Sequence, residues 1–173
     1  LSYYAGIGRV LRVYAYMNLV DLFGDVPYSE ANVPGIEFPH ADNSAAIYND
    51  LLVQLNQALK DFTATEGNST EPGSNDFLYN GDIQKWIKAT NTMKLKLLTQ
   101  SRLAKDEINN WKAELDSLIA EDNFIGNGED LQFPHTATLS PSDERKSGYV
   151  DEYEASQKSV WINPWLYEIM NGK

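Results

Sequence analysis

Apolar residues recur every three to four positions in four separate stretches of this chain, a spacing that predicts amphipathic helices. The first helix is expected at residues 3–23, and the others at 45–62, 83–104 and 111–121. In the first helix the predicted inward positions are Tyr3, Ile7, Val10, Leu11, Tyr14, Met17 and Val20. The fold class is therefore mainly α, with successive helices packed as antiparallel hairpins.

The character of the chain changes after Asp122. Residues 123–173 are rich in Gly, Pro, Ser, Asp and Glu and show no sustained helical spacing. A short strand is possible at 131–133 and a turn at 140–145. We expect a single domain, 1–173, in which a helical scaffold at 1–122 is followed by a long, irregular, loop-rich region at 123–173.

Composition and net charge limit the ligands and partners that this chain can be expected to bind. The 173 residues carry a formal net charge of −11, which argues against nucleic acid as a partner because phosphates require a basic surface. Neutral or cationic ligands are compatible with this charge. Cysteine is absent, so there is no disulfide framework and no thiolate nucleophile.

Candidate catalytic and metal-binding groups are sparse. The two histidines, His40 and His135, stand beside prolines, far apart and without metal-ligand spacing, so both are expected at the surface. Residues 122–130 gather oxygen side chains around glycines, but an Asn-Gly turn explains them better than a calcium loop. We therefore predict no enzyme activity, no metal and no cofactor.

Aromatic residues offer the best candidate ligand contacts, because sugar rings stack on them while polar neighbours bind hydroxyl groups. The candidate ligand-binding residues are Tyr149, Tyr153, Trp161, Asn163 and Trp165. The alternative is that the segment around Trp161 packs onto the helices. The residues expected in helix packing are Tyr3, Tyr14, Tyr48, Trp86 and Trp111.

The most distinctive segment is residues 14–31, YAYMNLVDLFGDVPYSEA. Gly24 stands where a helix ends in a left-handed backbone, and Pro27 prevents the helix from restarting. Phe23 and Tyr28 can pack back over this helix end. Asp25, Tyr28 and Glu30 are the candidates for fixing the loop that follows, Asp25 by accepting backbone N–H groups of the turn it begins.

This segment resembles the signature of the SusD/RagB family of surface lipoproteins. The resemblance recurs in KWIKATNTMKLKLL at residues 85–98. It implies a scaffold of tetratricopeptide-like hairpins and a non-catalytic protein that binds oligosaccharide. The implied partner is a SusC-like TonB-dependent transporter, and the implied location is the outer membrane, lipid-anchored and facing the exterior. The family's signal peptide and lipidated cysteine are absent here, so we interpret the chain as an internal fragment.

Two alternatives stay open at this stage. Members of the RagB type bind peptides, which would suit an acidic surface equally well. A helical scaffold that contacts another protein and binds no small molecule is the other possibility. The family's ligand contacts lie in variable loops, so the signature transfers no binding residue to this chain.

Overall fold

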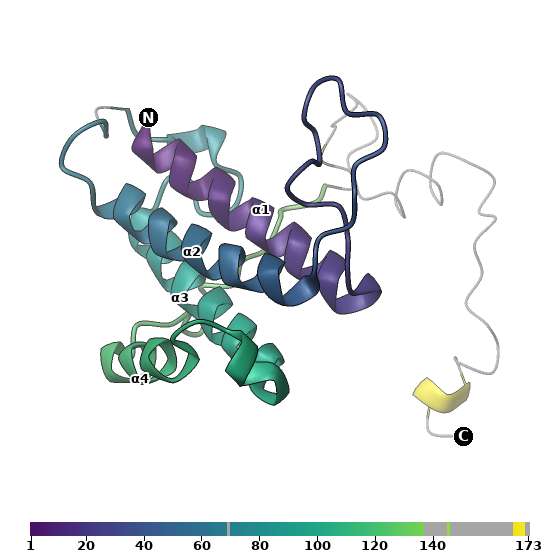
Figure 1. The fold of residues 1–173 in the computed structure, drawn as a ribbon. Coiled ribbons are helices and arrows are strands. Elements are labelled where there is room, and N and C mark those ends of the chain that lie inside the picture. The colour runs from purple at the N-terminus through teal and green to yellow at the C-terminus, as the bar shows by residue number, and fades with distance from the viewer. Residues whose placement is uncertain (69, 137–144, 146–167, 172–173) are drawn as a thin grey trace. The chain divides into compact units, whose positions relative to one another are not determined.

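The computed structural model describes residues 1–68, 70–136, 145 and 168–171, and the chain divides into two compact units, Leu1–Leu131 and Gln132–Lys173. The helices of the first unit are α1 (Ser2–Phe23), α2 (Ser44–Thr63), α3 (Ile83–Gln100) and α4 (Trp111–Glu121), with short 3₁₀ helices η1 (Gly73–Asn75) and η2 (Ser101–Glu107). Figure 1 shows α1 and α2 side by side and running in opposite directions.

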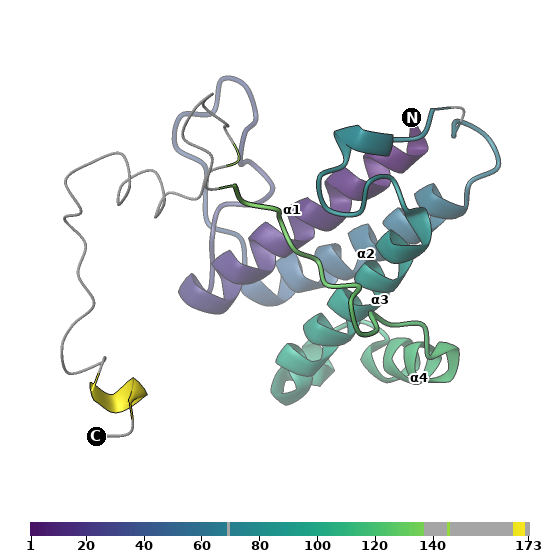
Figure 2. The ribbon, with the colours of Figure 1, turned by 180° about the vertical axis from the view of Figure 1, so that it is seen from behind.

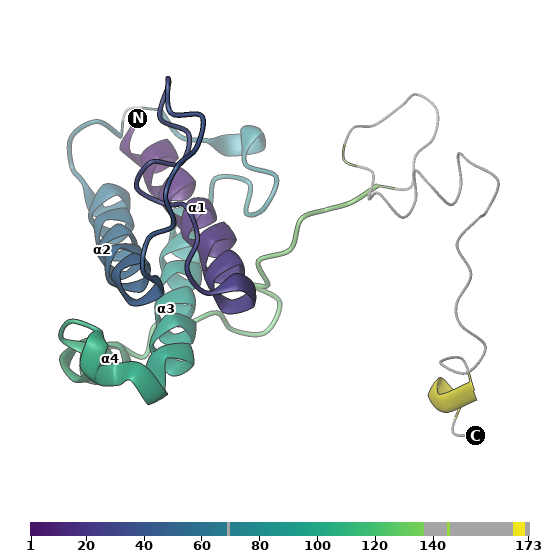
Figure 3. The same ribbon diagram turned by 45° about the vertical axis from the view of Figure 1, so that its right-hand side comes forward.

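The mainly α fold predicted from the sequence is confirmed. Helix α3 packs against α1 and α2, and α4 packs against the end of α3, as Figures 2 and 3 show from two further sides. An isolated bridge pairs Val26 with Asp42, and Thr136 is a further bridge residue, but the short strand expected at 131–133 does not form. None of the described helices combines the length and the apolar character needed to cross a membrane.

Helices α1 and α2 approach closely because α1 has a glycine at the contact. A Cβ atom added at Gly6 would lie 2.6 Å from Cε1 of Phe62, so no larger residue fits there without displacing the ring. Leu51 and Leu55 of α2 are fully buried and belong to the same hydrophobic core as Val10 and Val13 of α1. The burial of these side chains is the main force that holds the hairpin together.

The inward face of α1 differs in part from the predicted one. Val10, Val13 and Met17 are buried, but Leu11 is 41% exposed and Tyr14 is 51% exposed. Phe23 is also exposed and does not pack back over the end of the helix. The prediction was wrong at these positions because α1 carries apolar residues on more than one side, so spacing alone did not identify the buried side.

Helix α3 ends earlier than predicted. The α-helical backbone stops at Gln100, and residues 101–107 continue as η2, with non-helical angles at Ala104 (φ −111°). The hydroxyl of Ser101 donates to the carbonyl of Leu97, which satisfies one of the carbonyl groups left free at the helix end. In α4, Leu118 is buried, whereas the next residue, Ile119, is 60% exposed.

A buried aspartate organises the start of α3. Asp76 accepts hydrogen bonds from the Trp86 indole (Nε1–Oδ2, 2.7 Å) and from the backbone N–H groups of Leu78 and Gly81 (both 3.0 Å). Trp86 is fully buried, as predicted, and the ring of Tyr79 meets it edge to face at 5.3 Å. Sequence reasoning missed Asp76, which lies in a polar connection without any helical spacing.

The first turn of α1 is capped by the connection that follows α2. The backbone N–H of Tyr3 donates to the side-chain oxygen of Asn68 (2.9 Å), and the N–H of Ser2 donates to the carbonyl of Gly67 (3.2 Å). The amide of Asn68 in turn donates to the carbonyl of Ala64 at the end of α2 (2.8 Å). A residue outside the hairpin thus joins the start of α1 to the end of α2.

In the second unit only residues 132–136, 145 and 168–171 are described. The rings of Phe133 and His135 lie 4.9 Å apart, and Nδ1 of His135 is 3.0 Å from the carbonyl oxygen of Arg145. Residues 168–170 form a helical turn. The turn expected at 140–145 falls almost entirely outside the described residues.

Candidate functional site

The signature segment ends α1 and begins an ordered loop. Gly24 has φ 74°, the left-handed backbone that the sequence predicts, and its N–H donates to the carbonyl of Val20 (2.9 Å). After Pro27 the chain makes an excursion that returns at Asp42, whose N–H donates to the carbonyl of Val26 (3.0 Å). The loop at residues 24–43 therefore has a closed base.

The side chain of Asp42 holds this base. Its carboxylate accepts hydrogen bonds from the backbone N–H groups of Ser29 (2.8 Å) and Tyr28 (3.0 Å) and from the Ser29 hydroxyl (2.8 Å). The hydrogen bonds from Ser29 are the main reason that the pKa of Asp42 lies below its ordinary value. Asp25 has a different role from the predicted one, because it accepts from the N–H of Ser44 at the start of α2 (2.8 Å) rather than from its own turn.

Tyr28 anchors the loop to the helices. Its hydroxyl donates to Asp50 of α2, and its ring meets the Tyr16 ring edge to face at 4.6 Å. The guanidinium of Arg12 lies 4.9 Å from the centre of the same ring. Burial, followed by the hydrogen bond to Asp50, raises the pKa of Tyr28 well above its ordinary value, so the hydroxyl stays protonated as a donor.

His40 lies at the surface, as predicted, between two carboxylates. Its Nδ1 is 2.8 Å from Oε2 of Glu30, and its Nε2 is 3.4 Å from Oδ1 of Asp42. The hydrogen bond to Glu30 is the main cause that raises the pKa of His40. In the parts of the chain that the structure describes, no three His, Asp or Glu side chains are grouped to hold a metal ion.

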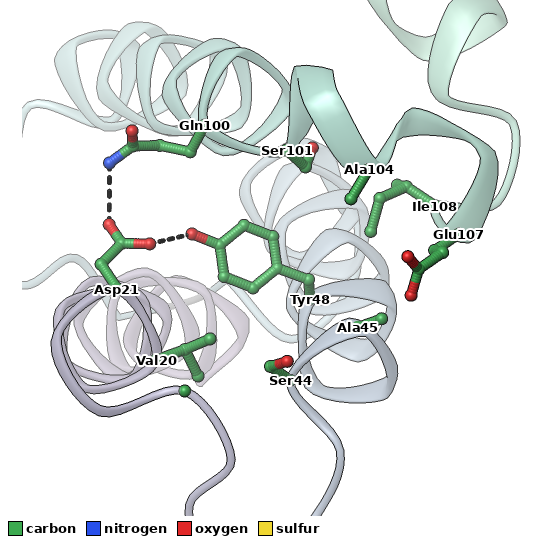
Figure 4. A pocket seen from close by; sticks show the side chains of 11 residues that line it. Val20, Asp21, Ser44, Ala45, Tyr48, Gln100, Ser101, Ala104, Glu107 and Ile108 are labelled. Atoms are coloured by element: carbon green, nitrogen blue, oxygen red, sulfur yellow. Dashed lines mark hydrogen bonds between the residues drawn. The ribbon is translucent and has the colours of Figure 1, made fainter.

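A pocket of about 280 Å³ lies where α1 ends, α2 begins and α3 passes into η2; we call it the acidic pocket (Figure 4). It is lined by Val20, Asp21, Gly24, Ser44, Ala45, Tyr48, Gln100, Ser101, Ala104, Glu107 and Ile108. Among the described residues, those that line it and carry a charge are Asp21 and Glu107. The pocket thus offers mainly hydrogen-bond acceptors to a ligand.

Asp21 joins the three helices around this pocket. One of its carboxylate oxygens accepts from the Tyr48 hydroxyl, and the other accepts from Nε2 of Gln100 (2.8 Å), as Figure 4 shows. The pKa of Tyr48 is raised, first by burial and then by the hydrogen bond to Asp21, so this hydroxyl remains a neutral donor. Tyr48 is buried, as expected of a residue in helix packing, but its hydroxyl also positions a carboxylate in the pocket.

Two further surface hollows share lining residues with the acidic pocket or with each other. Gln100 also lines a second hollow, of about 380 Å³, together with Thr92 and Lys96 of α3. Thr92 and Lys96 in turn line a third hollow, of about 200 Å³, together with Tyr14 of α1. We call this set of three hollows, which share lining residues in turn, the α1–α3 groove.

Tyr14 and Asp21 mark the two ends of this groove on α1. They are seven residues apart, so they lie on one side of the helix and about 10 Å apart along its axis. Residues 122–131, the segment after α4, complete the Tyr14 end with Ile125 and Leu131; Figure 2 shows this segment passing α3 toward α1. An exposed aromatic ring thus shares one surface with a pocket of acceptors.

The sequence-predicted ligand contacts cannot be compared with this groove. Tyr149, Tyr153, Trp161, Asn163 and Trp165 lie outside the described residues, and their role stays a prediction. The groove residues were not identified from the sequence. The spacing places Asp21 near the end of the first predicted helix, but it extends the third helix to residue 104 and so gives no sign that Gln100 ends α3.

Residues 122–130 adopt the turn that the sequence favours. The carboxylate of Glu129 accepts from the N–H of Gly126 (2.9 Å) and pairs with Nζ of Lys88 (2.8 Å). The hydrogen bond from Lys88 is the main cause that lowers the pKa of Glu129. This carboxylate is thus engaged by a cationic side chain of α3.

Known structures share this fold. A SusD homologue from Bacteroides fragilis matches with a TM-score of 0.67 and 24% identity over 79% of this chain and 29% of its own. An outer-membrane protein from Bacteroides vulgatus, linked to nutrient binding, matches with a TM-score of 0.67 and 20% identity over 81% of this chain and 31% of its own. A chitin-binding SusD homologue from Flavobacterium johnsoniae matches with a TM-score of 0.61 and 21% identity over 72% of this chain and 26% of its own.

This chain spans less than a third of the length of each of these proteins. No curated protein sequence matches it. The sequence model of the SusD-like family, described as starch-binding and associating with the outer membrane, matches residues 2–160. That match covers most of the chain and includes both segments that resemble the family signature, and the chain therefore belongs to the SusD-like family.

Proposed function

We propose that this chain is part of a protein that binds oligosaccharide nutrients at the outer membrane and delivers them to a TonB-dependent transporter of the SusC type. Membership of the SusD-like family supports the proposal, as does the description of that family as starch-binding. The chitin-binding homologue from Flavobacterium johnsoniae is a further saccharide-binding protein of the same fold. In the full-length protein we expect a lipid anchor and an outward-facing orientation.

The observation that carries the proposal is the α1–α3 groove. Sugar rings present flat C–H faces that stack on aromatic rings, and their hydroxyl groups donate to carboxylate and amide oxygens. Tyr14 supplies a half-exposed ring at one end of the groove, and Asp21 and Gln100 supply acceptors at the other. The proposed role is capture by stacking and hydrogen bonding, and it includes no catalytic step.

Peptide capture of the RagB type is the second candidate. The specific observation in its favour is the acidic pocket, whose charged lining residues in the described part of the chain, Asp21 and Glu107, are both acidic. A cationic peptide would gain from this charge, whereas a neutral oligosaccharide would use the same groups only as acceptors. The third candidate function is a scaffold that contacts another protein, and this hypothesis predicts that no small ligand binds in the groove.

Replacing the exposed ring tests the proposal. We expect Tyr14→Ala to weaken binding of starch-derived or chitin-derived oligosaccharides roughly threefold to tenfold, because stacking on one aromatic ring contributes about 0.5–1.5 kcal/mol. Titration calorimetry on the whole chain measures the effect. Tyr4→Ala is the matched control, because Tyr4 is also a partly exposed tyrosine of α1 but does not line the groove.

The outcomes separate the candidates. Saccharide binding that Tyr14→Ala leaves unchanged would remove the groove as the site and return attention to Trp161 and Trp165, which Trp→Ala variants can test. Binding of peptides alone would favour the RagB-type function. A folded chain that binds neither saccharides nor peptides would contradict nutrient capture by these residues.

A further inference from the structure

Residues 126–129, in the segment that follows α4, form a tight turn. The N–H of Glu129 donates to the carbonyl of Gly126 (3.2 Å), which places Asn127 and Gly128 at the tip of the turn. Both tip residues are exposed, and Gly128 has φ 79°, the left-handed backbone that a turn of this kind requires at its third residue. The tip is thus an Asn-Gly pair in contact with solvent.

An asparagine that is followed by glycine can lose its side-chain amide without an enzyme. The backbone nitrogen of the glycine gives up its proton and attacks Cγ of the asparagine, so that a succinimide ring forms and ammonia leaves. Water then opens the ring at either carbonyl, which gives aspartate or isoaspartate. Glycine favours the attack because it has no Cβ atom to hinder it. The attacking nitrogen must also be free of other hydrogen bonds.

The reacting groups of Asn127 and Gly128 are free. None of the described residues accepts a hydrogen bond from the N–H of Gly128, and none is hydrogen-bonded to the side-chain amide of Asn127. A Cβ atom added at Gly128 would have no heavy atom within 4 Å, so the space around this residue is open. Solvent can therefore remove the proton of the Gly128 nitrogen, and the amide can turn toward that nitrogen.

A second Asn-Gly pair, Asn80 and Gly81, has the opposite surroundings. Asn80 is also exposed, and its side chain has no hydrogen-bond partner among the described residues. The N–H of Gly81, however, donates to the carboxylate of Asp76 (3.0 Å), which is 8% exposed. A Cβ atom added at Gly81 would lie 2.6 Å from the backbone nitrogen of Gly73. The two pairs share a sequence but differ in the access to the attacking nitrogen.

We propose that Asn127 is a site of spontaneous deamidation, because the exposed tip of the 126–129 turn joins its unbonded side-chain amide to the unbonded N–H of Gly128. The reaction consumes water and releases ammonia, and it is independent of the proposed function. Asn80 should be spared, since Asp76 must first release the N–H of Gly81. The third Asn-Gly pair of the sequence, 171–172, extends beyond the described residues.

The isoaspartate product would change the backbone of the turn. Its main chain runs through Cβ and Cγ, so an additional carbon atom enters the chain between Gly126 and Glu129. The carboxylate of Glu129 pairs with Nζ of Lys88 (2.8 Å), and its backbone carbonyl accepts from the Tyr79 hydroxyl (2.8 Å). We expect the lengthened turn to loosen both contacts. The N–H of Glu129 should then exchange faster than in the Asn127→Asp variant, which carries the same added charge on an unaltered backbone.

The rates at the two pairs are measured in one sample of the folded chain. The chain is incubated at mildly alkaline pH in heavy-oxygen water, which labels the carboxylates formed during incubation, and is then digested and mapped by mass spectrometry. We expect Asn127 to react roughly tenfold faster than Asn80 or more, because the N–H of Gly81 is hydrogen-bonded to a charged acceptor. The rate at Asn127 should rise with pH, since the deprotonated nitrogen is the nucleophile.

Incubation in urea is the control. Both glycine N–H groups are free in the unfolded chain, so the two rates should converge there. A difference of the same size in urea would arise from the local sequence and would overturn the structural explanation. Equal rates in the folded chain, or faster conversion of Asn80, would overturn the proposal. Conversion of Asn127 in urea but not in the folded chain would overturn it as well, since the turn would then protect its own amide.

Discussion

Asp76 and Asp21 each accept a hydrogen bond from an aromatic side chain, as Asp50 does from Tyr28, but these two lie in opposite surroundings. Asp76 accepts from the indole of Trp86 and is 8% exposed, whereas Asp21 accepts from the hydroxyl of Tyr48 at the edge of the acidic pocket. Asp76 also accepts hydrogen bonds from the backbone N–H groups of Leu78 and Gly81, so both of its carboxylate oxygens already have protein donors. Asp21 receives two neutral donors and remains accessible.

The comparison separates a structural role from a binding role. A carboxylate that is enclosed and fully hydrogen-bonded has no capacity left for a ligand, so its contribution is to stability. A carboxylate that is held in place but exposed to solvent can accept further hydrogen bonds from a ligand. The number of protein donors and the exposure of the acceptor, rather than the residue types, distinguish the two pairs.

The largest expected effect is at the enclosed pair. Asp76→Ala would leave the buried Trp86 indole and the half-buried N–H of Gly81 without this acceptor, and we expect it to lower the free energy of unfolding by about 3 kcal/mol. Urea denaturation followed by tryptophan fluorescence measures this. Asp116→Ala, at an exposed position, should change stability by less than about 0.5 kcal/mol, and a similar loss in both variants would refute the structural role.

A smaller effect is expected at the open pair. Tyr48→Phe removes the hydroxyl that positions Asp21 but keeps the buried ring, so we expect a loss of about 1 kcal/mol in unfolding free energy. Ligand affinity at the pocket should fall as well, because Asp21 would be held only by Gln100. A variant that loses stability as severely as Asp76→Ala would remove the distinction between the pairs.

The smallest expected effect on stability is at His40 and the two carboxylates that contact it, Glu30 and Asp42. Because the raised pKa of His40 reflects its contact with Glu30, this contact stabilises the loop fully below pH 6.5 and is lost as the pH rises through the raised value. The pKa values of Glu30 and Asp42 are lowered, mainly by backbone hydrogen bonds from His40 and Ser29 respectively, so their contribution is lost as the pH falls through those values. The loop should be most ordered at mildly acidic pH.

An NMR titration of the imidazole signals tests this window. The sequence has only two histidines, so a His135→Gln background leaves the signal of His40 alone. We expect its midpoint above 6.5 and a decrease in the Glu30→Gln variant. A midpoint that Glu30→Gln does not move would show that the contact is absent in solution.

Much of the fold could be predicted because helical spacing is a local property. The helices predicted at 3–23, 45–62 and 111–121 correspond closely to α1, α2 and α4. The buried side of α1 was harder to predict, since the exposed Leu11 is as apolar as the buried Val13 and the exposed Tyr14 also carries a large apolar ring. The tetratricopeptide-like packing of the hairpins stays a prediction, and so does the boundary at residue 122 between the helical scaffold and the loop-rich region.

The site could not be predicted because its contacts join distant parts of the chain. Tyr48 is 27 residues from Asp21, and Gln100 is 79 residues from it. No spacing in the sequence indicates that these side chains meet. Gly24 indicated the end of α1 correctly, but Asp25 was predicted to accept N–H groups of its own turn, whereas it accepts from the N–H of Ser44 at the start of α2.

The cap on α1 bears on the order in which the chain folds. The first turn of α1 is completed by Asn68, which is 65 residues away and is itself attached to the end of α2. The start of a helix is costly to form without a partner for its free N–H groups. A nascent chain thus gains the complete α1 only after α2 and the connection beyond it have emerged, so these parts should acquire protection from hydrogen exchange together.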